Sequence, residues 1–184
     1  MSLSLDENKQ WLDPVRQVIS PNCDLRPSAC TISLIVIHGI SLPPGQFGND
    51  YIDQLFTNKL DPQQHAYFSQ IQNLKVSAHV LVDRAGQITQ YVPFDARAWH
   101  AGESCFEGVR ACNDYSIGIE LEGCDDLAYE QVQYRQLASI VKVLMQAWPA
   151  ITRKRIVGHS DIAPGRKTDP GTAFDWECFY NLID

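Results

Sequence analysis

The residues best suited to chemistry lie at or near the ends of three apolar segments. His38 ends SLIVIH, Glu120 lies in YSIGIEL, and His159 ends KRIVGH. Ligands of open α/β sheets usually gather outside the strand ends, so these three side chains are expected to lie near one another. A single histidine at a strand end is more often structural. Two such histidines together with a carboxylate in an apolar strand favour a functional site.

A loop rich in glycine and proline, GHSDIAPGRKTDPG, adds Lys167 and Asp169. The two residues are two positions apart, so an extended chain would point both to one side. With His38 and His159, Asp169 completes a three-ligand set for a catalytic zinc ion and leaves a fourth position for water. Zinc lowers the pKa of that water to about 7, a nearby carboxylate can accept its proton, and a lysine can stabilise an oxyanion. The sequence therefore predicts one Zn²⁺ per chain.

Two interpretations of Glu120 remain open at the level of its own segment. It alternates with three apolar residues, so it shares a face with Ser116 and Gly118. That face could be the solvated side of an antiparallel sheet, continued by Glu122, or it could present a general base whose small neighbours leave space for substrate. The segment by itself favours the solvated face.

Other catalytic patterns and a disulfide framework find no support. GRKT (165–168) lacks the glycine spacing of a phosphate-binding loop, and the chain contains no GxSxG, HExxH or GxGxxG. The six cysteines include no CxxC pair, and a core of this size needs no covalent staples. Reduced thiols are expected.

The elements that must position these residues alternate between strand and helix, which is typical of an α/β architecture. A proline- and glycine-rich loop covers 41–50, and the segment 76–92 has the pattern of a hairpin. Strands are predicted at 33–38, 76–82, 87–92, 115–121 and 154–159, and helices at 62–72, 129–147 and 174–183.

Length and composition predict one globular domain with a sizeable core. The chain has 184 residues, 45% of them hydrophobic and 20% charged. Its net charge of −7 argues against a general nucleic-acid or anionic-membrane surface. The N-terminus lacks the pattern of a secretory signal, and no apolar run approaches the roughly 18 residues of a membrane span. We expect a cytoplasmic protein with no membrane or nucleic-acid partner.

Four stretches resemble the AmpD-type N-acetylmuramoyl-L-alanine amidases, a family related to the peptidoglycan-recognition proteins. They are IVIHGISLPPGQFG, VSAHVLVDRAGQITQYVPFDARAWHAGES, CNDYSIGIELEG and IVGHSDIAPGRKTDPG, in the family's order. The resemblance implies a single α/β domain in which helices flank a mixed central β-sheet. It implies a catalytic domain over 30–184, with 1–29 as an N-terminal extension packed on it.

The resemblance also implies an activity and its residues. It matches His38, His159 and Asp169 to the zinc ligands, Glu120 to the carboxylate that activates the zinc-bound water, and Lys167 to the lysine that steadies the oxyanion. The implied reaction is hydrolysis of the amide between the lactyl group of (1,6-anhydro-)N-acetylmuramic acid and L-alanine. The implied setting is cytosolic peptidoglycan recycling, with a soluble muropeptide substrate, a monomeric enzyme and an indirect effect on β-lactamase induction.

The resemblance identifies the residues that contact substrate less completely than the metal ligands. Gly39 stands where the family commonly has asparagine, and Ala111 where it often has arginine, although Arg110 is adjacent. These departures affect peptide recognition and leave the metal chemistry intact. The candidate substrate contacts are Trp99, Arg110 and Asn113, with core packing as the alternative for Trp99.

The remaining histidines have simpler interpretations. We expect His65 on the surface, His79 buried in a strand with its hydrogen bonds satisfied, and His100 in the lining of the substrate cleft. Two alternatives to the cytosolic enzyme remain: a non-catalytic module that recognises peptidoglycan fragments, and an envelope amidase that acts on intact cell wall.

Overall fold

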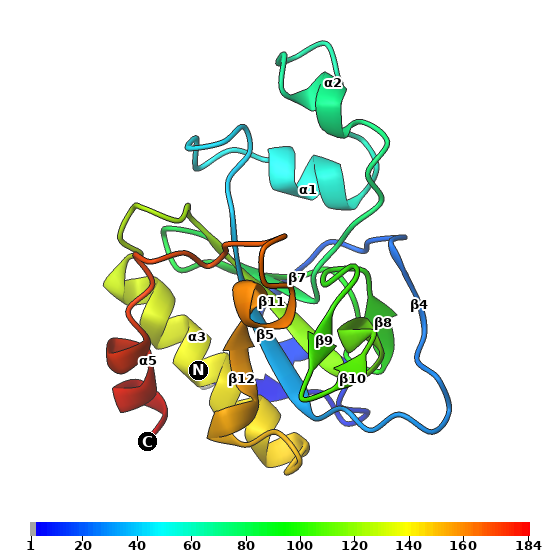
Figure 1. Ribbon diagram of the computed structural model, residues 1–184, viewed down its shortest axis with the longest axis vertical. Helices are drawn as coiled ribbons and strands as arrows, with labels where there is room; N and C mark the ends of the chain where they lie inside the picture. The colour runs from blue at the N-terminus through cyan, green and yellow to red at the C-terminus, as the bar shows by residue number, and fades with distance from the viewer. Residues whose placement is uncertain (1–2) are drawn as a thin grey trace.

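A six-stranded mixed sheet forms the centre of the molecule in a computed structural model that describes residues 3–184 (Figure 1). Its first four strands are parallel, the fifth runs antiparallel to the fourth, and the last is parallel to the fifth. In spatial order the strands are β12 (Ile156–Gly158), β5 (Leu34–Ile40), β11 (Ser116–Glu122), β6 (Val80–Val82), β7 (Ile88–Gln90) and β3 (Arg16–Gln17).

The two longest strands, β5 and β11, lie side by side in the middle of this sheet. Parallel strands covered on both faces are apolar almost throughout, and β11 is buried along its whole length. Their register pairs His38 with Glu120, and β12 on the other side of β5 pairs Gly158 with Ile37. The topology therefore brings His38, Glu120 and the residue after Gly158 to one end of the sheet.

One face of the sheet is covered by α3 (Gln131–Ala147), with α5 (Trp176–Ile183) against it (Figure 1). Helix α3 begins with a capping box between Glu130 and Gln133. Its apolar positions recur at helical spacing and join the largest core cluster through Leu137, Ile140, Val141 and Leu144. The predicted helices at 129–147 and 174–183 are confirmed, with ends shifted by up to two residues.

The chain between β5 and β6 leaves the sheet and carries α1 (Tyr51–Phe56) and α2 (Phe68–Ile71), which lie together at the top of Figure 1. The loop at 41–50 is present as predicted, but the helix predicted at 62–72 is wrong before residue 68. That segment buries only two apolar side chains, Phe68 and Ile71, which is too little tertiary packing to hold three helical turns.

Short pairs of β-strands complete the fold. The sequence pattern does not predict them. A hairpin joins β1 (Ser4–Leu5) to β2 (Leu12–Asp13), β4 (Cys23–Leu25) pairs with β8 (Ala96–Ala98), and β9 (Cys105–Phe106) pairs with β10 (Val109–Arg110). The hairpin predicted at 76–92 is confirmed, with β6 and β7 as its two shorter strands. His159 begins a four-residue helix, α4 (His159–Ile162), where the sequence predicted the end of a strand.

Two further properties concern the chain as a whole. All six cysteines are free. No helix within residues 3–184 is both long enough and apolar enough to span a bilayer.

Candidate functional site

Three potential metal ligands converge at the sheet end where β5 and β12 meet α4. The His38 Nδ1 atom lies 2.9 Å from His159 Nδ1 and 3.2 Å from Asp169 Oδ2, and the last two atoms are 3.0 Å apart. His38 comes from β5, His159 from the first position of α4, and Asp169 from the loop that follows α4. Within residues 3–184, no other three histidine, cysteine or acidic side chains converge in this way.

The chemistry of this donor set fits a divalent cation. Two ring nitrogens at 2.9 Å repel each other unless a proton or a cation lies between them. The other nitrogen of His159, Nε2, is 3.2 Å from the carbonyl oxygen of Ala101, which can only accept a hydrogen bond, so the Nδ1 lone pair of neutral His159 faces the site. Two imidazole nitrogens and one carboxylate oxygen are ligands typical of zinc.

The protonation states favoured by the protein also suit a metal. Burial lowers the pKa of His38 to about 4, although the adjacent Asp169 carboxylate opposes this effect, so the ring stays neutral near pH 7. Burial by itself would raise the pKa of Asp169, but its contacts with His159 and His38 outweigh burial and hold that pKa well below its usual range. Neutral imidazoles and an ionised carboxylate are the forms that coordinate metals.

Glu120 lies near these candidate ligands and has a buried carboxyl group with one unpaired oxygen. Only 9% of it is exposed, and its Oε2 atom has no hydrogen-bond partner among residues 3–184. Burial raises its pKa well above the usual value, the charge of Asp169 raises it further, and Lys167 opposes both. A carboxyl group with a raised pKa is suited to accept a proton from water and to return it.

The interpretation of the Glu120 side of its strand as a solvated face is wrong. Glu122 on the same face is only 3% exposed, because β11 is a central parallel strand covered on both sides. The Glu122 carboxylate accepts backbone N–H groups from Gly48 at 2.7 Å and Arg84 at 3.1 Å. It therefore ties the 41–50 loop to the turn between β6 and β7.

These groups open into a cleft of about 760 Å³. The apolar part of the lining comes largely from the segment that carries α1 and α2, and the polar part includes exposed Lys167 beside Asp169. Half-buried Trp99 and buried His100 also line the cleft. The apolar lining consists of Leu42, Pro44, Leu55, Phe56, Tyr67, Ile71, Leu74 and Val76.

A family model described as N-acetylmuramoyl-L-alanine amidase matches residues 28–172. The chain belongs to this amidase family. An Escherichia coli K12 protein named 1,6-anhydro-N-acetylmuramyl-L-alanine amidase AmpD is 56% identical to the amidase over 94% of both chains. The crystal structure of a selenomethionine derivative of AmpD superposes with a TM-score of 0.94 at 54% identity, covering 98% of the amidase and 99% of that chain.

A more distant structure carries a ligand. AmpDh3 from Pseudomonas aeruginosa, in complex with anhydromuramic pentapeptide, has a TM-score of 0.62 and 29% identity, covering 89% of the amidase and 65% of that chain. The relatives confirm the resemblance to AmpD-type enzymes, the mixed sheet flanked by helices, and N-acetylmuramoyl-L-alanine amidase activity.

Two predicted substrate contacts of the amidase lie away from this cleft. Arg110 is exposed on β10 and lines a separate depression of about 530 Å³, together with Arg166. The Asn113 side-chain oxygen accepts the backbone N–H groups of His100 at 3.2 Å and Ala101 at 2.8 Å. Asn113 therefore holds the loop after β8 and does not line the cleft.

Sequence reasoning missed Arg166, which touches both the cleft and the neighbouring depression of the amidase. One of its terminal nitrogens donates to the carbonyl oxygens of Ala101 and Glu103, each at 2.6 Å. Ala101 also accepts from the candidate ligand His159, so Arg166 helps to fix the loop behind His159. The sequence signal that could have identified Arg166 is its position next to Lys167 in GRKT (165–168).

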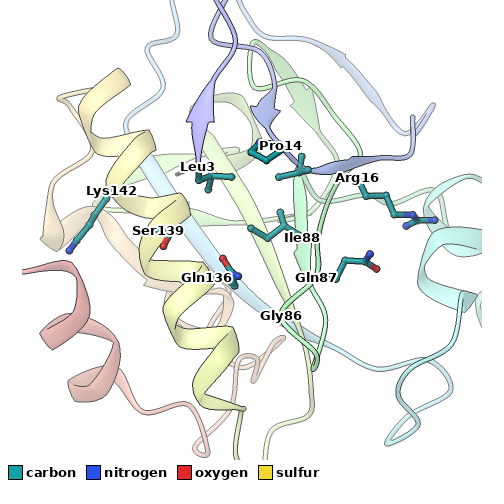
Figure 2. Close-up of a pocket in the computed structure, with 10 residues that line it drawn as sticks. Leu3, Pro14, Arg16, Gly86, Gln87, Ile88, Gln136, Ser139 and Lys142 are labelled. Carbon is teal, nitrogen blue, oxygen red and sulfur yellow. The ribbon is translucent and has the colours of Figure 1, made fainter. Parts of the chain in front are cut away.

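Another groove of the amidase, of about 710 Å³, lies between the N-terminal strands, the β6–β7 turn and α3 (Figure 2). Figure 2 shows Leu3 and Pro14 on one side and Gln136, Ser139 and Lys142 of α3 on the other. None of the candidate ligands or catalytic residues lines this groove.

Proposed function

We propose that the chain is a zinc-dependent amidase that hydrolyses the bond between the lactyl group of 1,6-anhydro-N-acetylmuramic acid and L-alanine in soluble muropeptides. The observation that carries this proposal is the convergence of three donor atoms beside an unpartnered, buried carboxyl group in one cleft. The name of the E. coli relative supports the anhydro sugar, and the anhydromuramic pentapeptide bound to AmpDh3 supports a muropeptide fragment.

In this proposal one Zn²⁺ is held by His38, His159 and Asp169. The two rings offer their Nδ1 atoms, and the carboxylate supplies one negative charge. When bound, the ion supplies Lewis acidity to the scissile carbonyl group and to the attacking water. Three protein ligands are the number that catalytic zinc sites use.

Glu120 is the proposed general base and, later, the general acid. The water oxygen forms a bond to the carbonyl carbon while one of its protons passes to a Glu120 oxygen. The resulting tetrahedral carbon then expels the L-alanine nitrogen, which takes that proton from Glu120. The second proton of the water also passes to this nitrogen, so the products are a lactyl carboxylate and the ammonium group of L-alanine. The raised pKa of Glu120 suits a group that must both accept and return a proton.

Two further residues of the cleft have proposed roles toward the substrate. Lys167 lies on the polar rim and brings a positive charge to the oxyanion that forms on the carbonyl oxygen. Trp99, which also lines the cleft, offers a large apolar surface to the substrate.

We further propose that the enzyme acts as a monomer in the cytoplasm, in the recycling of peptidoglycan fragments. Removal of the stem peptide would then lower the pool of muropeptides and, where a β-lactamase is inducible by them, lower its induction. The name of the E. coli relative supports the anhydro-muropeptide substrate on which this setting depends.

The decisive experiment is mass spectrometry of purified anhydro-muropeptide after incubation with the full chain, with and without a strong chelator. We expect free stem peptide and free anhydro sugar, no products with chelator, and restored cleavage after Zn²⁺ is added back. A folded, zinc-loaded chain that binds the muropeptide without cutting it would instead favour the recognition module. A chain that releases peptide only from intact cell wall would favour the envelope amidase.

A further inference from the structure

We propose that His100 is a positioning residue that fixes the ring of His38 for metal binding, an inference that rests on the metal centre proposed above. The His38 Nε2 atom lies 2.9 Å from His100 Nδ1, and His100 Nε2 lies 3.1 Å from Ser116 Oγ. All three residues are buried, and the two rings meet edge to face at 88°. They form a chain of hydrogen bonds that ends at the metal ligand.

The direction of this chain follows from the position of the ligand atoms. His38 Nδ1 faces His159 and Asp169, so it can bind a cation only when it carries a lone pair. The ring proton must then reside on Nε2. Among residues 3–184, the one hydrogen-bond partner of this atom is His100 Nδ1. His100 therefore accepts from His38 and carries its own proton on Nε2, which it donates to Ser116.

The two histidine ligands are held in different ways. His159 Nε2 faces the backbone carbonyl of Ala101, which is always an acceptor. His38 depends instead on a side chain that could run its hydrogen bonds in either direction. The reverse direction would place a proton on His38 Nδ1, among the ligand atoms, and would oppose metal binding. An orienting partner on the second ring nitrogen is a common feature of histidine–metal sites.

The fold reserves space for the His100 ring. A β-carbon added at Gly118 of β11 would lie 2.4 Å from the Cγ atom of His100, although the backbone of Gly118 is ordinary strand. The backbone N–H of His100 donates a hydrogen bond to the side-chain oxygen of Asn113. Ser116 and Gly118, the small residues on the same face of β11 as Glu120, therefore make room for His100. The sequence had suggested that they make room for substrate.

The test measures Zn²⁺ affinity by competition with a chromophoric chelator, and the absorption bands of Co²⁺ bound in place of zinc. His100→Leu removes the acceptor and is expected to weaken Zn²⁺ binding roughly ten- to a hundredfold and to alter the Co²⁺ bands. His100→Asn places an amide oxygen near the former Nδ1 position and should stay within about threefold of wild type. His65→Leu, at an exposed histidine remote from the ligands, serves as the control.

Unchanged Zn²⁺ affinity in His100→Leu, or equal losses in the leucine and asparagine variants, would overturn the inference while leaving the metal site intact. If His100→Leu does not fold, Ser116→Ala provides the test, because it removes only the outer hydroxyl group. We expect roughly threefold weaker Zn²⁺ binding there, and no change would contradict the chain of hydrogen bonds. A wild-type chain that fails to bind Zn²⁺ would overturn the metal centre and this inference together.

Discussion

Glu120 and His38 occupy paired positions on neighbouring parallel strands, so backbone register sets their separation. Both strands lie in the middle of the sheet, where the chain is least free to move. Substitutions that preserve side-chain volume at these positions are therefore expected to change chemistry with little change in structure.

Glu120→Gln tests the proposed base. The amide keeps the shape of the side chain but cannot accept the proton of water, so kcat should fall roughly a hundred- to ten-thousandfold. Zn²⁺ content should remain at one ion per chain, because Glu120 is not one of the three candidate ligands that converge. Steady-state kinetics on anhydro-muropeptide, with metal analysis of the same sample, check both expectations. A fully active variant would rule out this role for Glu120.

Asp169→Ala tests the ligand assignment. The substitution removes the only carboxylate among the three donors, and the two remaining histidines are too few for a stable zinc site. Both bound Zn²⁺ and turnover should be lost after dialysis against buffer without added metal. Metal analysis by mass spectrometry provides the measurement, and full retention of zinc would show that the carboxylate is not a ligand.

The sequence could locate most of the site because four of its polar residues follow apolar runs or share one short loop. His38, His159, Lys167 and Asp169 were identified from such patterns. The local pattern misjudged Glu120, because alternation along one strand does not tell whether its second face is covered. That depends on where β11 lies in the sheet, and its neighbours β5 and β6 come from distant parts of the chain.

Elements with a long or regular apolar pattern were predicted, and the very short strands that exist only through a distant partner were not. Helix α3 has 17 residues of regular apolar periodicity, which is a strong local signal. Strand β4 has three residues, and it exists because Cys23 pairs with Ala98, which is distant in the sequence. The 41–50 loop also takes its position from a distant residue, Glu122.

Glu122→Gln tests this tether between elements. The carboxylate accepts two backbone N–H groups, whereas glutamine would turn an NH₂ group toward one of them. We expect a loss of about 1–3 kcal/mol in the free energy of unfolding, and faster hydrogen exchange in the 41–50 loop. Urea unfolding and hydrogen-exchange mass spectrometry measure these effects. Exposed Glu177 on α5 offers the matched control, since Glu177→Gln should change neither quantity.

For the whole molecule, three buried histidines link stability to pH. Burial lowers the pKa of His38 to about 4, and it lowers those of His79 and His100 well below the usual value. In the unfolded chain the same rings would bind protons near pH 6.5. The unfolded state therefore binds more protons than the folded state between about pH 6.5 and 4, and acid must favour unfolding in that window.

The metal-free protein is accordingly expected to lose stability as the pH falls from 7 to 5. Each ring that stays neutral in the fold contributes up to about 1.4 kcal/mol per pH unit to this slope. Because the chain carries a net charge of −7, acid also relieves self-repulsion, but this diffuse effect has the opposite sign and is weaker than desolvation of a buried cation. Urea unfolding of chelator-treated protein at intervals of half a pH unit gives the slope. His79→Gln should reduce it and exposed His65→Gln should not, whereas a flat wild-type profile would mean that these rings are not kept neutral by the fold.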